Sequence, residues 1–186
     1  MPQPELTETW HRGDWMQTFT GQQFFPLEPR VEDIDILDIA HALSMQCRYN
    51  GHVQRFYSVA EHCVLLSHAV DRELALWALL HDAPEAYIGD MVRPLKMNMP
   101  DFREADDRIM AVIAEKYGLG GVEIPPAVKD ADTRILLNER DALLSAPPRP
   151  WAVHGAPLDI TIQAWAPARA EREYLNRFVQ LTQEAV

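Results

Sequence analysis

Apolar residues recur at intervals of three and four positions over most of the chain, the spacing that places them on one face of an α-helix. Six segments carry this pattern: residues 35–46, 58–70, 71–89, 101–117, 125–144 and 166–184. Helix-start signals support it, since Ser58 followed by Glu61 forms a capping box and either Asp33 or Asp35 can act as an N-cap. We therefore expect an all-α fold with little strand.

Residues 1–33 lack this pattern. Glycines and prolines there interrupt a series of aromatic residues, namely Trp10, Trp15, Phe19, Phe24 and Phe25. We expect an irregular or partly stranded N-terminal arm that packs its aromatic side chains on the body. Prolines also mark a loop at 146–157. With 186 residues the chain suits one domain, which has its core at about 34–144 and a closing helix at about 166–184.

The formal charge of −11 disfavours a nucleic-acid polymer as partner, because no basic tract offsets the repulsion by phosphates. A small anionic substrate needs only one local cationic pocket and stays possible. The two cysteines, Cys47 and Cys63, are too few for a disulfide framework and indicate reduced thiols in a cytoplasmic protein. No run of about 18 apolar residues occurs, so we expect no membrane span.

The pair His81-Asp82 closes the strongly apolar run at 74–80. Ionisable groups buried there are costly unless they are paired or bind a metal. One interpretation is a hydrogen-bonded His–Asp pair without a metal. The other is a divalent-metal site, because imidazole and carboxylate are typical ligands. His62 on the preceding predicted helix and Asp132 on a later one can complete a set of four ligands, with water in the open positions.

Pro84 lies inside the predicted helix at 71–89. A proline there removes one backbone hydrogen bond and displaces the carbonyl group of Leu80. We expect a kink or distortion of this helix beside His81 and Asp82.

The order His62, His81-Asp82 and Asp132 in a helical chain resembles the HD-domain phosphohydrolase superfamily. The resemblance covers about 34–144. It implies an HD-domain helical bundle in which these four residues bind one divalent metal ion, which could be Mn, Co, Fe, Zn or Mg.

The segment at 81–85 (HDAPE), with Gly-Asp at 89–90 and Pro-Leu-Lys at 94–96, resembles the bacterial 5′-deoxynucleotidase branch, which carries HDxxE, then GD and PxK. The segment at 58–62 (SVAEH) is similar to its first-histidine motif. The phosphodiesterase branch that cleaves cyclic dinucleotides has a lysine soon after HD, and the HDAPE segment argues against it.

The resemblance also implies roles for four other residues. Glu85 matches an acid that assists catalysis, and its i+4 spacing from His81 puts both on one helical face. Asp90 matches a second acidic site residue. Arg48 matches an arginine that holds the substrate phosphate, although Tyr49 stands where that branch has tryptophan. Lys96 either adds a second positive charge or forms a salt bridge with Asp90.

Together these residues and the resemblance imply a metal-dependent phosphohydrolase that acts on a nucleotide phosphomonoester, and the expected substrate is a 5′-deoxynucleoside monophosphate. Two alternatives stay open: a nucleoside triphosphate or pyrophosphate hydrolase, and a non-catalytic HD module that binds a nucleotide. The expected partners are the small nucleotide and a second copy of the chain in a homodimer. Neither a nucleic-acid polymer nor a membrane is expected.

Overall fold

The computed structural model describes residues 12–183, and it is mostly helical as the sequence pattern predicts. The α-helices are α1 (Ile36–Met45), α2 (Val59–His68), α3 (Ala75–Leu80), α4 (Glu85–Ile88), α5 (Arg93–Lys96), α6 (Pro100–Tyr117), α7 (Pro126–Leu143) and α8 (Pro167–Gln183). Short 3-10 turns lie at Val31–Asp33 (η1), Arg48–Gly51 (η2) and Arg72–Leu74 (η3). Within the described residues, no helix is both long enough and apolar enough to cross a bilayer.

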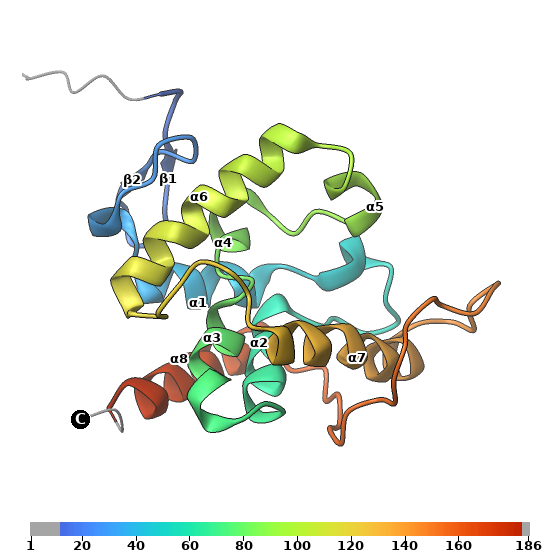
Figure 1. The fold of residues 1–186 in the computed structure, drawn as a ribbon. Helices are drawn as coiled ribbons and strands as arrows, with labels where there is room; N and C mark the ends of the chain where they lie inside the picture. The colour runs from blue at the N-terminus through green and yellow to red at the C-terminus, as the bar shows by residue number, and fades with distance from the viewer. Residues whose placement is uncertain (1–11, 184–186) are drawn as a thin grey trace, which may run out of the picture.

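The helices form an upper and a lower group in Figure 1. Helices α5 and α6 belong to the upper group, and α2, α7 and α8 to the lower one. The chain passes between the groups along α3 and α4. The main apolar cluster extends beyond 34–144, because it includes Phe24 from the arm and Tyr174 from α8 as well as residues of α1, α2, α3, α6 and α7.

The N-terminal arm is partly stranded, as expected. Strands β1 (Met16–Gln17) and β2 (Gln23–Phe24) pair antiparallel, with Met16 opposite Phe24. Phe24 is fully buried and stacks on Tyr87 of α4, with ring centroids 4.0 Å apart. The prediction that the aromatic side chains of the arm pack on the body holds only in part, since Trp15 and Phe19 stay exposed. The first eleven residues of the predicted arm, Trp10 among them, lie outside the described residues.

Local sequence signals set several helix ends. The Asp35 side chain accepts a hydrogen bond from the Leu37 N–H and caps α1 (2.8 Å). Ser58 Oγ caps α2 by accepting from the Glu61 N–H (3.1 Å). Glu61 does not complete the capping box, because its carboxylate accepts instead from the backbone N–H groups of residues 163–165. This contact ties the segment before α8 to the first turn of α2.

The predicted helix at 71–89 is broken into three pieces: η3, α3 and α4. Residues 81–84 form turns between α3 and α4, with the Ala83 N–H bonded to Leu80 O and the Glu85 N–H to Asp82 O. The distortion predicted from Pro84 is therefore confirmed. Helix α5 was not predicted, and α8 ends at Gln183, beyond which the structure describes no residue.

Candidate metal centre

Four side chains from three parts of the chain converge: His62 from α2, His81 and Asp82 from the break after α3, and Asp132 from α7. The Nε2 atoms of the two histidines are 3.3 Å apart. Each lies 3.2–3.7 Å from Asp82 Oδ2 and from Asp132 Oδ1. Atoms that bind one divalent ion at about 2.0–2.2 Å lie about 3.0–3.6 Å from one another, and the distances from the two Nε2 atoms fall close to that range. Ligand atoms of His62, His81 and Asp132 all lie within 4.8 Å of one another.

The other ring nitrogen of each histidine is already occupied. His62 Nδ1 lies 2.7 Å from Glu139 Oε1, and His81 Nδ1 lies 2.8 Å from the carbonyl oxygen of Ala78. Both partners are acceptors, so each Nδ1 carries the proton in a neutral ring and each Nε2 presents a lone pair. Two lone pairs that face each other beside two carboxylates require a cation or protons between them. The four residues therefore fit a divalent metal ion.

The electrostatics of the cluster lead to the same conclusion. Burial lowers the pKa of His81, but the charges of Asp82 and Cys63 and the hydrogen bonds to Asp132 and Asp82 together outweigh this effect, and the net pKa lies well above its usual value. Burial raises the pKa of Asp132, but its hydrogen bonds to His62 and His81 outweigh that and hold the pKa well below normal. Without an ion the carboxylates thus keep protons on the imidazoles, at the place where a metal would bind.

Glu139 of α7 was not singled out from the sequence, yet it contacts three site residues. Besides His62, its carboxylate accepts from the Tyr49 hydroxyl (2.5 Å) and lies 3.3 Å from Arg48 Nη2. Glu139 is fully buried. Burial alone would raise its pKa, but the positive charges of Arg48 and then His62 lower the pKa to about 2.

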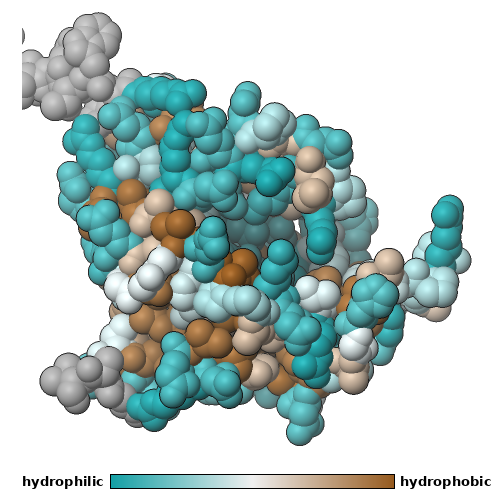
Figure 2. Space-filling view, in the orientation of Figure 1, coloured by the Kyte–Doolittle hydropathy of each residue, from teal (hydrophilic) through white to brown (hydrophobic). Residues whose placement is uncertain are grey.

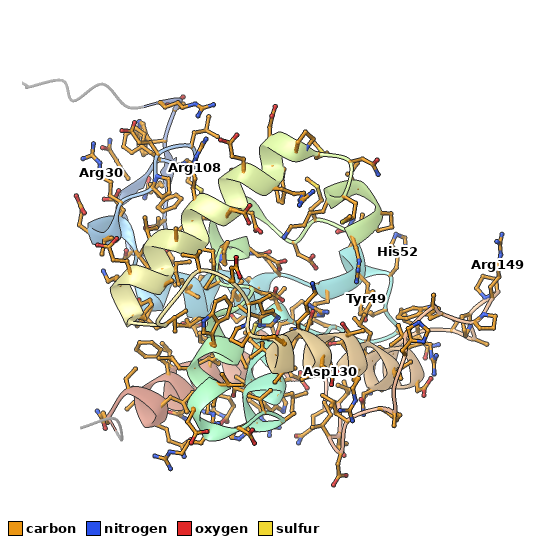
Figure 3. The ribbon with its side chains drawn as sticks, in the orientation of Figure 1. Arg30, Tyr49, His52, Arg108, Asp130 and Arg149 are labelled. Carbon is orange, nitrogen blue, oxygen red and sulfur yellow. The ribbon has the colours of Figure 1, made fainter. Side chains whose placement is uncertain are left out.

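Arg48 lies beside the four candidate ligands, on the turn η2. Its Nη1 is 3.4 Å from Asp82 Oδ2, and its buried Nε has no partner among the described residues. Tyr49 and Asn50 on this turn have left-handed backbone angles, with φ of 58° and 49°. Figure 3 places Tyr49 on this turn and His52 directly after it, above α7. The turn thus brings one cation next to the acidic cluster.

Glu85 and Asp90 lie at the two ends of α4. Gln46 holds both ends, because its amide donates to Glu85 O (2.8 Å) and accepts from the Asp90 N–H (3.0 Å). Glu85 is only 7% exposed, and its buried Oε2 has no partner among the described residues. Burial, and then the charges of Asp82 and Asp90, raise the pKa of Glu85 well above its usual value. Glu85 is thus a carboxyl group that favours keeping its proton.

Lys96 pairs with Asp106 of α6 (3.1 Å), and not with Asp90 as one alternative had it. The predicted phosphate contact of Lys96 is untested by this arrangement. Asp106, which the sequence did not single out, therefore belongs to the surroundings of the site.

A cleft of about 900 Å³ opens next to the cluster and includes His81, Asp82 and Asp132 in its lining. Figure 2 shows the surface hollowed between α6 and α7, with mostly hydrophilic walls. Further lining residues are the apolar Trp77, Met110, Val122 and Ile124, and the acidic Asp106, Asp107 and Glu123. Lys129 is the only Lys or Arg among the described lining residues. The cleft offers a small molecule both apolar surface and access to the candidate ligands.

Known proteins resemble almost the whole chain. It is 41% identical over 172 residues to "Uncharacterized protein YfdR" of Escherichia coli (strain K12), which covers 91% of this chain and 96% of the relative. The chain belongs to the YfdR family. A further relative is "Uncharacterized protein RCAP_rcc00048" of Rhodobacter capsulatus, 38% identical over 132 residues, or 64% of this chain and 67% of the relative. No family model matches the chain. Neither name states an activity, so the function of this YfdR-family chain has to be inferred from its site.

Proposed function

We propose that the chain is a divalent-metal-dependent phosphohydrolase of the HD-domain type that hydrolyses a 5′-deoxynucleoside monophosphate. The observation that carries the proposal is the convergence of two histidine Nε2 atoms, 3.3 Å apart, with oxygen atoms of Asp82 and Asp132. Imidazole plus carboxylate is a ligand set that suits Mn, Co, Fe, Zn or Mg. A bound ion would lower the pKa of a coordinated water and offset charge on phosphoryl oxygens.

The chain's own residues would bind the phosphate and move the proton. Arg48 is within reach of Asp82 Oδ2, one of the candidate ligand atoms, and its guanidinium can bind a phosphate with two N–H groups. Glu85 lies one turn after the ligand pair and favours the protonated state, which suits a general acid that protonates the leaving alkoxide. Asp90 follows α4 and would act with Glu85 in the acidic part of the site.

The charge of the cleft favours a monophosphate over a triphosphate. Asp106, Asp107 and Glu123 line the cleft together with a single lysine, Lys129, and Lys96 offsets only the charge of Asp106. Each additional phosphate group would add negative charge next to these carboxylates. The apolar part of the lining can pack against the nucleoside.

The test is phosphate release from a panel of deoxynucleoside mono- and triphosphates with Mn²⁺, Co²⁺, Zn²⁺ or Mg²⁺ added. We expect orthophosphate from monophosphates in the presence of metal and none after chelation. Release of triphosphate or pyrophosphate would instead support the alternative, a nucleoside triphosphate or pyrophosphate hydrolase. Nucleotide binding without turnover under any metal would replace it by the non-catalytic module.

The predicted homodimer, the cytoplasmic location and the lack of nucleic-acid and membrane partners stay predictions. Size measurement in solution tests the first of them directly.

A further inference from the structure

We propose that Glu139 is a positioning residue that orients the ligand His62 and, with its second oxygen, anchors the Arg48–Gly51 turn to the same centre. This inference rests on the proposed metal site and adds a residue to it. Glu139 would bind neither the ion nor the substrate, and would act through His62, Arg48 and Tyr49.

Glu139 lies on the face of α7 that carries Asp132. It follows Asp132 by seven residues, about two helical turns, so both side chains point from α7 toward α2. Glu139 has no exposed surface. Burying a carboxylate costs free energy unless its oxygens are hydrogen-bonded or paired with positive charges. The partners of Glu139 therefore indicate its role.

The two carboxylate oxygens are divided between two tasks. Oε1 lies 2.7 Å from His62 Nδ1 and fixes the tautomer whose Nε2 faces the other ligands. Oε2 accepts from the Tyr49 hydroxyl at 2.5 Å and from Arg48 Nη2 at 3.3 Å. One residue thereby connects α2, α7 and the turn η2.

The turn needs such an anchor because of its backbone. Tyr49 and Asn50 are consecutive non-glycine residues with positive φ, a conformation that side chains disfavour. The turn's own backbone bonds, Arg48 N–H to Tyr57 O and His52 N–H to Tyr49 O, lie at its ends. Glu139 holds the side chains between them, and so sets where the Arg48 guanidinium lies relative to Asp82.

The division of tasks makes Glu139→Gln informative. A glutamine keeps the size of the side chain but has one acceptor oxygen in place of two. The glutamine oxygen can accept a hydrogen bond either from His62 or from the side chains of the turn. Its NH₂ group then faces a donor on the other side, so one of the two contacts is lost. We expect Mn²⁺ affinity to fall by about 10- to 100-fold, the usual effect of removing a partner that orients a ligand. We also expect the Co²⁺ absorption spectrum to change and KM for the nucleotide to rise.

Glu61→Gln is the matched control. Glu61 is equally buried and lies next to His62 on α2. Its carboxylate accepts hydrogen bonds from the backbone N–H groups of residues 163–165, away from the ligand nitrogens. It should lower the unfolding temperature and leave Mn²⁺ affinity at the wild-type value. Tyr49→Phe separates the two tasks, because it removes one of the two contacts between Glu139 and the turn and keeps the His62 contact. It should raise KM with little change in Mn²⁺ affinity.

Calorimetric titration with Mn²⁺ alone distinguishes the outcomes. Selective loss of affinity in Glu139→Gln supports the inference. Equal affinities in Glu139→Gln, Glu61→Gln and wild type would overturn it while the metal centre stands. Wild-type protein that binds no Mn²⁺, Co²⁺ or Zn²⁺ would overturn the centre and the inference together. If Glu139→Gln does not fold, Glu139→Asp provides the same test, because its shorter carboxylate cannot reach both His62 and Tyr49.

Discussion

His62 and His81 each use one ring nitrogen to fix the ring and leave the other for a ligand. The fixed nitrogens bond to Glu139 and to Ala78 O, and the remaining ones converge with Asp82 and Asp132. This arrangement fits the proposed metal site better than a simple His–Asp pair, which would bond through one nitrogen and need no second histidine.

The ligand role of Asp132 can be tested against a neighbour on the same helix. Asp132→Asn removes a negative ligand atom, so we expect the purified variant to lose bound metal and phosphate release. Asp130→Asn is the control, since Asp130 is exposed on α7 and pairs with Arg134. Measuring the metal content of both purified variants tests the ligand role of Asp132. Full metal content in Asp132→Asn would exclude Asp132 as a ligand.

Glu85→Gln should keep the metal and slow the reaction. The substitution preserves size but removes the proton that Glu85 would donate, so we expect kcat to fall by about 100- to 10,000-fold. Because burial disfavours the charged form of Glu85, the variant should be at least as stable as wild type. Loss of metal from this variant would instead make Glu85 a ligand.

Metal binding should strengthen as the pH rises. The pKa values of His62 and His81 are raised above their usual value in the ion-free protein, and both rings must be neutral to bind an ion. We therefore expect weaker Mn²⁺ binding at about pH 6 than at about pH 8, with protons released on binding. Titration in buffers of different ionisation enthalpy measures this release. Affinity that does not change with pH would argue against imidazole ligands.

At the scale of elements, the break between α3 and α4 shows what the sequence could predict. Helical spacing located α1, α2, α6, α7 and α8, and Pro84 located the distortion. The spacing of apolar residues could not identify Glu139 as a site residue, because its contacts depend on how α7 packs against α2. A signal was available in retrospect: Glu139 lies between the buried Leu137 and Leu143, where an unpaired carboxylate is not expected.

Asn138 ties the segment before α8 to α7. Its amide donates to Leu158 O and Ile160 O and accepts from the Leu158 N–H. Asn138→Ala should therefore lower the free energy of unfolding by about 1–3 kcal/mol, since part-buried backbone groups of Leu158 and Ile160 lose their hydrogen bonds. Denaturant unfolding measures the loss. Asn176→Ala, at an exposed position on α8, serves as the control and should change stability little. Equal values would mean that Asn138 does not hold the segment.

For the whole molecule, the charge of −11 disfavours a nucleic-acid surface but does not show where the acids lie. Part of that charge is concentrated in the centre and along the cleft, where Asp106, Asp107 and Glu123 face the site. Charge counts cannot reveal this, because the three residues meet only when α6 packs near the start of α7. The pairing of Lys96 with Asp106 likewise depends on the placement of α5, which the sequence pattern did not predict.

An ion should stabilise the whole protein, because its ligands come from α2, α7 and the break after α3. With free Mn²⁺ at about 100 times its Kd, we expect about 2.7 kcal/mol of added stability. Thermal unfolding with Mn²⁺ and then with a chelator measures this difference. The same rise in Asp132→Asn would show that the ion acts elsewhere.

The contact between His62 and Glu139 joins residues 77 positions apart, whereas the two histidines are 19 apart. During synthesis the histidine pair therefore leaves the ribosome long before Asp132 and Glu139 do. A fragment that stops before α7 would contain three of the four candidate ligands and neither carboxylate from that helix. Newly made chains should therefore acquire the ion only after α7 has been synthesised and has packed on α2.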